Sequence, residues 1–297
     1  MKVEFFNRAT GTVEEEAIFG EGPLRWVYET HLGKITLWAL VRRSIFSKIY
    51  GWEMSRPSSR ERILPFIEKY GIDAETFETA PENFKSFNDF FSRKLKANAR
   101  PVAAGNAVAC LPADGRHFAF ENLSATTQIF AKGQQFDLKT FLGDETLAKR
   151  YEQGSLLCSR LCPTDYHRFH LPVAGTLISE PRLINGMLYS VNPIALSQNL
   201  AYLWENKRIV VEIDSPEFGK VTQVIVGATN VGTICLTAKP GMPLAKGEEL
   251  GYFRFGGSFV ATFFEKGRIR FCDDLTGATK RGLETYALMG EILGSGQ

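Results

Sequence analysis

The pattern of hydrophobic and polar positions changes near residue 100. Before Arg100-Pro101, apolar residues recur every three or four positions in 34–52, 60–70 and 87–94, which is typical of amphipathic helices. We expect Pro65 to kink or shorten the second of these helices. Beyond residue 100, short runs rich in Val, Ile, Thr and Phe alternate with Gly, Asn and Pro, which predicts strands. These runs are Leu156–Leu161, Gly175–Ser179, Arg208–Ile213, Val221–Val226, Gly232–Leu236 and Ser258–Phe264.

This change predicts an α+β protein, with a helical region over residues 1–100 and a β-rich catalytic core over residues 101–297. The stretch 34–52 carries apolar residues on one helical face, flanked by basic side chains: Trp38, Val41, Ile45, Ile49 and Trp52, with Lys34, Arg42, Arg43 and Lys48. Such a helix suits an anionic membrane surface. The alternative is a helix that packs on its own domain or on a sister subunit.

Composition narrows the class of protein. The chain has 297 residues, 44% of them hydrophobic, and a net charge of +2, without a basic tract of the kind that binds nucleic acid. We expect no signal peptide, because the first twenty residues carry four glutamates and no apolar core. The uncharged run Val221–Ala238 contains glycines, threonines and Asn230, so we expect two strands there and not a membrane span. Five cysteines without metal-site spacing indicate reduced thiols and a reducing cytosol.

The first candidate catalytic residue is Ser258, which follows two glycines in Gly256-Gly257-Ser258. Glycines open backbone conformations closed to other residues, so the Ser258 hydroxyl can approach the Gly257 carbonyl and attack it. The resulting ester would lead by elimination to a pyruvoyl group at a new N-terminus. Glycine and serine are also ordinary turn residues, and taken alone this motif favours a plain turn over self-cleavage.

A carboxylate and imidazoles occur upstream, Asp114 in Leu111-Pro-Ala-Asp-Gly115 and His167 and His170 in Asp165-Tyr-His-Arg-Phe-His170. In a strand, an offset of three sends the two histidines to opposite faces, which argues against a shared metal ion; we expect no metal. One histidine facing Ser258, with Asp114 behind it, would be a base and its orienting partner. The alternatives are a turn aspartate and hydrogen-bonded core histidines.

Taken together, these segments resemble the phosphatidylserine decarboxylase family. The resemblance covers most of residues 60–297. It is carried, in order, by Lys85-Ser-Phe-Asn-Asp-Phe-Phe-Ser-Arg-Lys-Leu95, Ala99-Arg-Pro101, Pro112-Ala-Asp-Gly115, Asp165-Tyr-His-Arg-Phe-His170, Tyr189-Ser-Val-Asn192, Val226-Gly-Ala-Thr-Asn-Val-Gly-Thr-Ile234 and Gly251-Tyr-Phe-Arg-Phe-Gly-Gly-Ser258.

The resemblance implies a self-cleaving proenzyme. His170 is then the base that takes the Ser258 proton, Asp114 orients it, and His167 is accessory. Cleavage between Gly257 and Ser258 gives fragments 1–257 and 258–297, which stay associated, and Ser258 becomes the pyruvoyl cofactor. That group forms a Schiff base with phosphatidylserine and releases CO2 to give phosphatidylethanolamine. The family also implies a homodimer of the two-chain unit at the cytoplasmic face of the cell membrane.

One departure is Phe259, because the family motif usually continues with threonine after the serine. An alternative is therefore a relative of the family that no longer cleaves itself and only binds lipid. A serine hydrolase using Asp114, His170 and Ser258 is the other alternative, although Gly256-Gly257-Ser258-Phe259-Val260 is not the Gly-x-Ser-x-Gly elbow. Leu293-Gly-Ser295 looks like a second cleavage motif, but cleavage there would release only a tripeptide. We expect Ser295 to be exposed.

Overall fold

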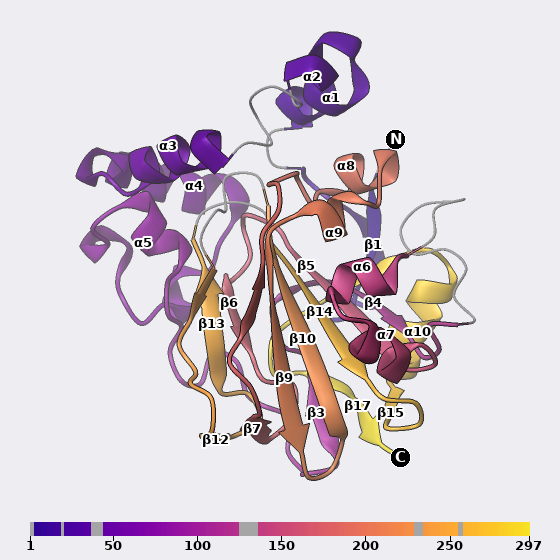
Figure 1. Ribbon diagram of the computed structural model, residues 1–297. Helices are drawn as coiled ribbons and strands as arrows, with labels where there is room; N and C mark the ends of the chain where they lie inside the picture. The colour runs from indigo at the N-terminus through magenta and orange to yellow at the C-terminus, as the bar shows by residue number, and fades with distance from the viewer. Residues whose placement is uncertain (1–2, 19–20, 37–43, 125–135, 229–233, 255–257) are drawn as a thin grey trace.

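The computed structural model covers the chain and describes residues 3–18, 21–36, 44–124, 136–228, 234–254 and 258–297. Its centre is a large, mostly antiparallel sheet (Figure 1). In spatial order the strands are β12 (Pro243–Leu244), β7 (Gly175–Leu177), β9 (Arg208–Ser215), β10 (Gly219–Gly227), β14 (Ser258–Phe264), β5 (Ser155–Leu161), β4 (Gly115–Phe120), β16 (Glu284–Ala287), β1 (Glu4–Asn7) and β2 (Thr12–Glu15), with β8 (Arg182–Ile184) beside β9.

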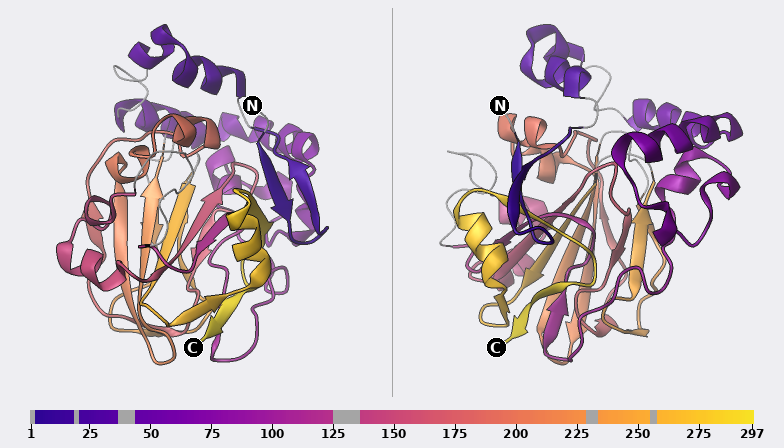
Figure 2. Two further views of the ribbon diagram at one scale, coloured as in Figure 1. Left: turned by 90° about the vertical axis from the view of Figure 1, so that its right-hand side faces the viewer. Right: turned by 180° about the vertical axis from the view of Figure 1, so that it is seen from behind.

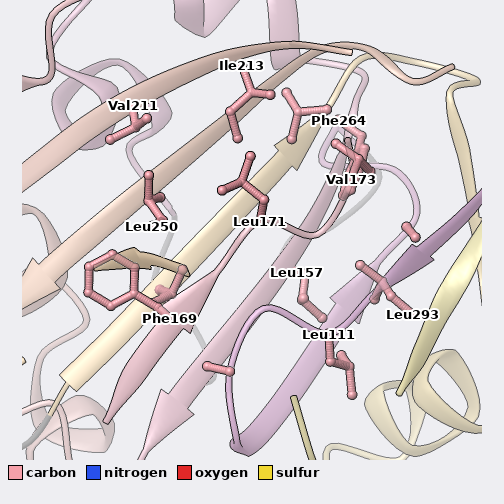
Figure 3. Close-up of a cluster of buried hydrophobic side chains, with 14 of the residues drawn as sticks. Leu111, Leu157, Phe169, Leu171, Val173, Val211, Ile213, Leu250, Phe264 and Leu293 are labelled. Atoms are coloured by element: carbon pink, nitrogen blue, oxygen red, sulfur yellow. The ribbon is translucent and has the colours of Figure 1, made fainter. Parts of the chain in front are cut away.

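Two smaller sheets accompany the large one. The first orders β11 (Ile234–Leu236), β13 (Glu249–Phe253) and β6 (Arg168–His170), and the second β15 (Ile269–Phe271), β17 (Ile292–Gly296) and β3 (Val108–Cys110). An apolar core joins them to one face of the large sheet, and Figure 3 shows Leu250 of the first small sheet near Val211 of the large one. The first small sheet carries the two-histidine segment, so this core fixes that segment against the large sheet.

The other face of the large sheet packs against short helices. These are α6 (Leu138–Leu142), α7 (Glu145–Tyr151), α8 (Pro193–Gln198) and α9 (Tyr202–Glu205). Residues alternate along β14 as a pleated strand requires, with Val260 and Phe264 in the first core and Phe259, Ala261 and Phe263 in the second. The start of β14 is therefore enclosed on both faces.

The remaining helices lie mainly in the first hundred residues. They are α1 (Glu21–Glu29), α2 (His31–Thr36), α3 (Ser44–Met54), α4 (Ile63–Tyr70) and α5 (Phe87–Phe91), with 3-10 turns at Pro57–Arg62, Ala74–Thr76 and Pro81–Asn83; α10 (Asp273–Lys280) is near the C-terminus. Figure 1 shows α3, α4 and α5 grouped at one end of the molecule, where Met54 of α3, Phe66 of α4 and the phenylalanines of α5 belong to a separate core. The mixed α+β architecture is confirmed.

Several boundaries differ from the sequence-based expectation. Residues 60–62 belong to a 3-10 turn, and α4 begins only at Ile63, so that Pro65 lies in its first turn, where its missing N–H costs nothing. The helix expected over 87–94 ends at Phe91, and Arg168 donates to the carbonyls of the next two residues, Ser92 and Arg93. Trp38 and Val41 lie outside the described residues, as does the side chain of Ile45.

The predicted strands are confirmed where they are described, and β14 has the expected bounds. The run Val221–Ala238 contributes to two strands, β10 and β11, which belong to different sheets. One feature was not expected: β1 and β2 form a hairpin that joins the large sheet through a parallel pairing of β1 with β16. The left view of Figure 2 shows this indigo hairpin at the edge of the sheet. The division at residue 100 stays a prediction, and the hairpin links its two parts.

Candidate active site

Strand register brings the candidate residues to one end of the large sheet. Ser258, the first residue of β14, lies opposite Leu161, the last residue of β5, and opposite Gly227, the last residue of β10. Arg116 of β4 pairs with Arg160 of β5, so Gly115 and Asp114 come next, at the level of Ser258. Gly115 is needed there because a Cβ would lie 2.5 Å from the Arg160 carbonyl oxygen. Asp114 and Ser258 thus reach the same end of the sheet from strands on either side of β5.

Ser258 is fully buried. Its Oγ has no hydrogen-bond partner among the residues that the structure describes. A buried hydroxyl left unpaired costs about 1–3 kcal/mol, so each such group in a native protein calls for an explanation, of which a catalytic role is one. Gly256 and Gly257 lie outside the described residues, and the predicted scissile bond is therefore described only on its Ser258 side.

Phe259 does not share a face with Ser258. Its side chain is 1% exposed and belongs to the second core, with Ala261 and Phe263. Alternation along β14 places Ser258 on the opposite face, with Val260. The residue that departs from the family motif is thus a packing residue of the far side of the sheet.

His170 is held at both ring nitrogens. Its Nδ1 lies 3.0 Å from the Gly247 carbonyl oxygen and its Nε2 lies 3.2 Å from the Tyr166 hydroxyl. Its backbone N–H donates to the Pro112 carbonyl at 2.8 Å, which ties β6 to the segment before Asp114. Burial lowers the pKa of His170 below its ordinary 6.5, although the Gly247 carbonyl, Glu249 and Asp114 act in the opposite direction. A neutral imidazole near pH 7 can act as a base.

Asp114 has other hydrogen-bond partners than the one expected. Its carboxylate accepts from Arg100, with Nη2–Oδ2 at 2.5 Å, and from the Met289 backbone N–H at 2.8 Å. Within the described part of the chain, His170 hydrogen-bonds neither to Asp114 nor to Ser258. Asp114, His170 and Ser258 therefore form no hydrogen-bonded triad within the described residues, and Asp114 acts on His170 through its charge.

His167 faces a different environment from His170, as the offset of three predicts. Its Nδ1 lies 2.9 Å from the Asp165 carbonyl oxygen, and its ring centroid is 3.9 Å from that of Phe91 in α5. The His167 carbonyl accepts from the N–H of Phe253, near the end of β13. His167 is thus fixed between α5 and the strand that leads to Ser258.

Sequence reasoning missed Arg93, although it lies in one of the quoted motifs. This arginine is 4% exposed, with its guanidinium 5.0 Å from the Phe77 ring and 4.9 Å from the Phe90 ring. Its Nη2 donates to the Asp165 carbonyl that also receives His167 Nδ1. Burial lowers the pKa of Arg93 to about 10. Arg93 therefore helps to fix the two-histidine segment.

Sequence reasoning also missed a buried network of charges. Arg160 donates to Glu16 at 2.6 Å and to Glu284 at 2.5 Å, and Arg116 donates to both oxygens of Asp165. Burial alone would raise the pKa of Glu16, but Arg160 and Arg116 hold it at about 2. Glu16 follows β2, so the N-terminal hairpin is ionically connected to the segment that leads to His167.

Among the described residues, no group of three or more His, Cys, Asp or Glu side chains is arranged to hold a metal ion. All five cysteines are free thiols, and burial raises the pKa of Cys162 well above its ordinary value. None of the helices in the described ranges is long and apolar enough to cross a bilayer. Ser295, in β17, is exposed, as expected.

Comparison with known proteins shows the family of the chain. The profile of the family described as phosphatidylserine decarboxylase matches residues 87–294. A phosphatidylserine decarboxylase proenzyme of Chlamydia trachomatis serovar L2 is 43% identical over 290 residues, covering 98% of this chain and 96% of its own. Proenzymes of the same name from Fusobacterium nucleatum (40% over 294 residues, 99% and 98%) and Clostridium botulinum strain 657 (41% over 293 residues, 99% of each) are similar over nearly their full length. The chain therefore belongs to the phosphatidylserine decarboxylase family.

Proposed function

We propose that this chain is a phosphatidylserine decarboxylase proenzyme that cleaves itself between Gly257 and Ser258 and converts phosphatidylserine to phosphatidylethanolamine. The observation that carries the proposal is Ser258, a buried serine at the start of a central strand whose hydroxyl lacks a partner among the described residues. An unpaired hydroxyl is available to attack a neighbouring carbonyl, whereas a hydrogen-bonded one is partly committed elsewhere.

Maturation begins when Ser258 Oγ attacks the Gly257 carbonyl carbon while His170 takes the hydroxyl proton. The bond from Gly257 to the Ser258 nitrogen breaks, and an ester to Oγ forms. Elimination of the Gly257 carboxylate, with loss of the Ser258 α-proton, leaves a dehydroalanine, and water replaces its nitrogen by oxygen with release of ammonia. Fragment 258–297 stays in place because β14 pairs along its whole length with both β10 and β5.

The pyruvoyl group made from Ser258 would supply an electron sink for the electron pair that departing CO2 leaves on the α-carbon of the substrate. The surroundings fit a group of this origin, because the Ser258 side chain is enclosed between strands and shares its face with the apolar residues of the first core. His170, neutral and buried, is the residue that we assign to return a proton to the product.

We assign Asp114 and His167 supporting roles. Asp114 acts on His170 through its negative charge, which favours the protonated ring that exists after proton transfer. His167 is the accessory residue, held by the Asp165 carbonyl and the Phe91 ring. Neither assignment requires a metal ion.

We propose that the protein is peripheral to the cytoplasmic face of the membrane and contacts it through its N-terminal helices. The described residues of this region expose large apolar side chains: Trp26 (47%), Leu32 (70%), Ile49 (62%) and Trp52 (63%). The Arg56 guanidinium lies 4.8 Å from the Trp52 ring, so a cation accompanies the apolar surface, as an anionic leaflet favours. By family resemblance we also propose a homodimer of the two-chain unit.

Conversion of vesicle phosphatidylserine to phosphatidylethanolamine tests the activity. We expect product formation, inhibition by hydroxylamine, and attachment of a hydrazide probe to fragment 258–297. A serine hydrolase would instead stay one chain and react with a fluorophosphonate at Ser258, and a lipid-binding relative would react with neither reagent. Either result would contradict the proposal.

A further inference from the structure

Lys207 lies in the same row of the large sheet as Ser258. Gly227 separates them, because it pairs with Ser258 and its N–H donates to the Lys207 carbonyl at 2.9 Å. The next residue, Arg208, pairs with Val226 on the face of the second core, so alternation puts Lys207 on the face of Ser258. The two residues are thus two strand spacings, about 10 Å, apart on one face of the sheet.

The side chain of Lys207 is free to reach toward Ser258. No side chain of β10 stands between them, because residue 227 is a glycine. The four-carbon stem of a lysine can carry its ammonium over Gly227. This ammonium forms neither a hydrogen bond nor an ion pair with any residue that the structure describes. A cation without a protein partner in that part of the chain therefore shares a face with the reactive serine.

This face of the sheet becomes more exposed from Ser258 toward Lys207. Ser258 is fully buried, whereas Lys207 is half-buried. The adjacent row of the same face follows the same trend, since Ile225 is fully buried, Ile209 is half-buried and Leu183 of β8 is 49% exposed. Within the described ranges, a ligand that approaches Ser258 over this face from the side of β8 passes Lys207.

Arginines near this end of the sheet are already bonded to the protein. Three of them are in ion pairs, Arg100 with Asp114, Arg116 with Asp165 and Arg168 with Glu249. Two others donate to backbone carbonyls, Arg208 to four of them and Arg93 to two. An anionic ligand would have to displace these partners, which is not required at Lys207.

The substrate of the proposed reaction carries two anionic groups, a carboxylate and a phosphodiester. The carboxylate leaves as CO2, so a cation bound to it would stabilise the substrate more than the transition state and would slow the reaction. The phosphodiester is present in substrate and product alike, and a cation that binds it holds the lipid without opposing the chemistry. Lysine binds phosphate groups as a point charge.

We propose that Lys207 binds the phosphodiester of the phosphatidylserine head group and so orients the lipid toward position 258. The proposal rests on the proposed function, because it names how the substrate of that reaction is held. It gives Lys207 no part in self-cleavage, because no lipid takes part in that step.

Kinetics of the mature Lys207→Met protein test the proposal. With soluble dihexanoyl-phosphatidylserine, which needs no membrane binding, KM should rise by roughly tenfold to a hundredfold, as expected for loss of a hydrogen bond to a charged group, while kcat changes little. Dihexanoyl-phosphatidylethanolamine has the phosphodiester and lacks the carboxylate, so its inhibition constant should rise by the same factor. Lys207→Arg should keep most of the affinity, and both variants should mature at the parent rate.

The matched control is Lys220→Met. Lys220 belongs to the same pair of strands as Lys207 but lies at their other end, where its ammonium is paired with Asp214. This variant should leave KM and the inhibition constant unchanged. Equal effects of the two methionine variants would overturn the proposal, because a general loss of positive charge would then explain them.

Two further results would overturn the proposal. One is an unchanged KM in Lys207→Met. The other is a raised KM with unchanged inhibition by dihexanoyl-phosphatidylethanolamine, which would place the cation on the carboxylate.

Calorimetric binding of dihexanoyl-phosphatidylethanolamine separates this proposal from the proposed function, because binding needs no turnover. A parent chain that binds this lipid tenfold or more tighter than Lys207→Met does, yet neither cleaves nor releases CO2, would contradict the proposed function alone. A parent that decarboxylates but binds the lipid no better than Lys207→Met would contradict the role of Lys207 alone. Absence of both turnover and binding would overturn both.

Discussion

Arg100 donates to both carboxylate oxygens of Asp114, from Nε and from Nη2, and the side chains of Arg100 and Asp114 are 17% and 3% exposed. They come from neighbouring loops of the core, and the pair lies beside the segment that carries His170. Asp114 would otherwise be a buried charge with one backbone N–H as its partner. The ion pair therefore makes the predicted position of Asp114 compatible with folding.

Arg100→Gln should destabilise the protein by about 3–5 kcal/mol, because removal of one partner leaves the other charge buried and uncompensated. Urea unfolding of the Ser258→Ala chain measures this, since cleavage then does not intervene. Arg62→Gln is the matched control, because its ion pair with Glu53 is about half exposed and should contribute little. Equal losses for the two variants would show that the Arg100–Asp114 pair is not energetically special.

The ionised Glu16 carboxylate should make the stability of the folded protein depend on pH in the acid range. Its folded pKa of about 2 lies below its ordinary 4.5, so its stabilising contribution is complete above pH 4.5 and is lost as the pH falls toward 2. The difference corresponds to roughly 3 kcal/mol. Glu16→Gln should lower stability at pH 7 and flatten the pH dependence in this window, whereas the exposed Glu4→Gln should change neither. Unfolding curves from pH 7 to pH 2 on the Ser258→Ala chain would contradict this if the parent and Glu16→Gln proteins ran parallel.

Phe259→Thr restores the residue that the family usually has, and it separates packing from chemistry. Phe259 fills the second core, so its loss should cost up to about 3–5 kcal/mol through the cavity it leaves. Self-cleavage should nevertheless proceed, because the side chain lies on the face of β14 opposite Ser258. Thermal unfolding and intact mass give the two readouts. A faster maturing and equally stable variant would mean that Phe259 impairs the reaction directly.

Binding to vesicles should depend on the exposed apolar residues of α3. Ile49→Ser with Trp52→Ser removes two side chains that are more than 60% exposed, and should weaken co-sedimentation with phosphatidylserine vesicles severalfold without loss of stability. Met242→Ser, 55% exposed and outside the helical region, is the matched control. If the control and the double variant sediment alike, these helices serve another interface.

The sequence predicted those features that depend on local patterns. The bounds of β14 followed from its run of β-branched and aromatic residues, whereas the early end of α5 and the contact of the following Arg93 carbonyl with Arg168, 75 residues away, did not follow from the local pattern. The hairpin of β1 and β2 was missed because its charged residues, including Glu14 and Glu15, obscure alternation, and its partner β16 is near the other end of the chain.

The candidate site was predictable as a set of residue types, and its contacts were not. Asp114 and His170 were found from motifs, but the partners Arg100, Tyr166 and Gly247 depend on how β6 and β13 pack against the large sheet. From the sequence alone, Arg160 and Glu16 would be expected to be ordinary surface charges. They are 144 residues apart, and the fold brings them together in the interior. Hydrogen-bond partners of buried polar groups are set by tertiary structure, which no local pattern contains.

Self-cleavage between Gly257 and Ser258 can be tested by the intact mass of freshly purified protein under denaturing conditions. We expect two masses matching 1–257 and 258–297, with pyruvoyl in place of serine on the smaller. Ser258→Ala should give one full-length mass, and Ser295→Ala, in the Leu293-Gly-Ser295 sequence, should cleave like the parent. A parent chain of single full-length mass, or cleavage that survives Ser258→Ala, would contradict self-cleavage at this bond.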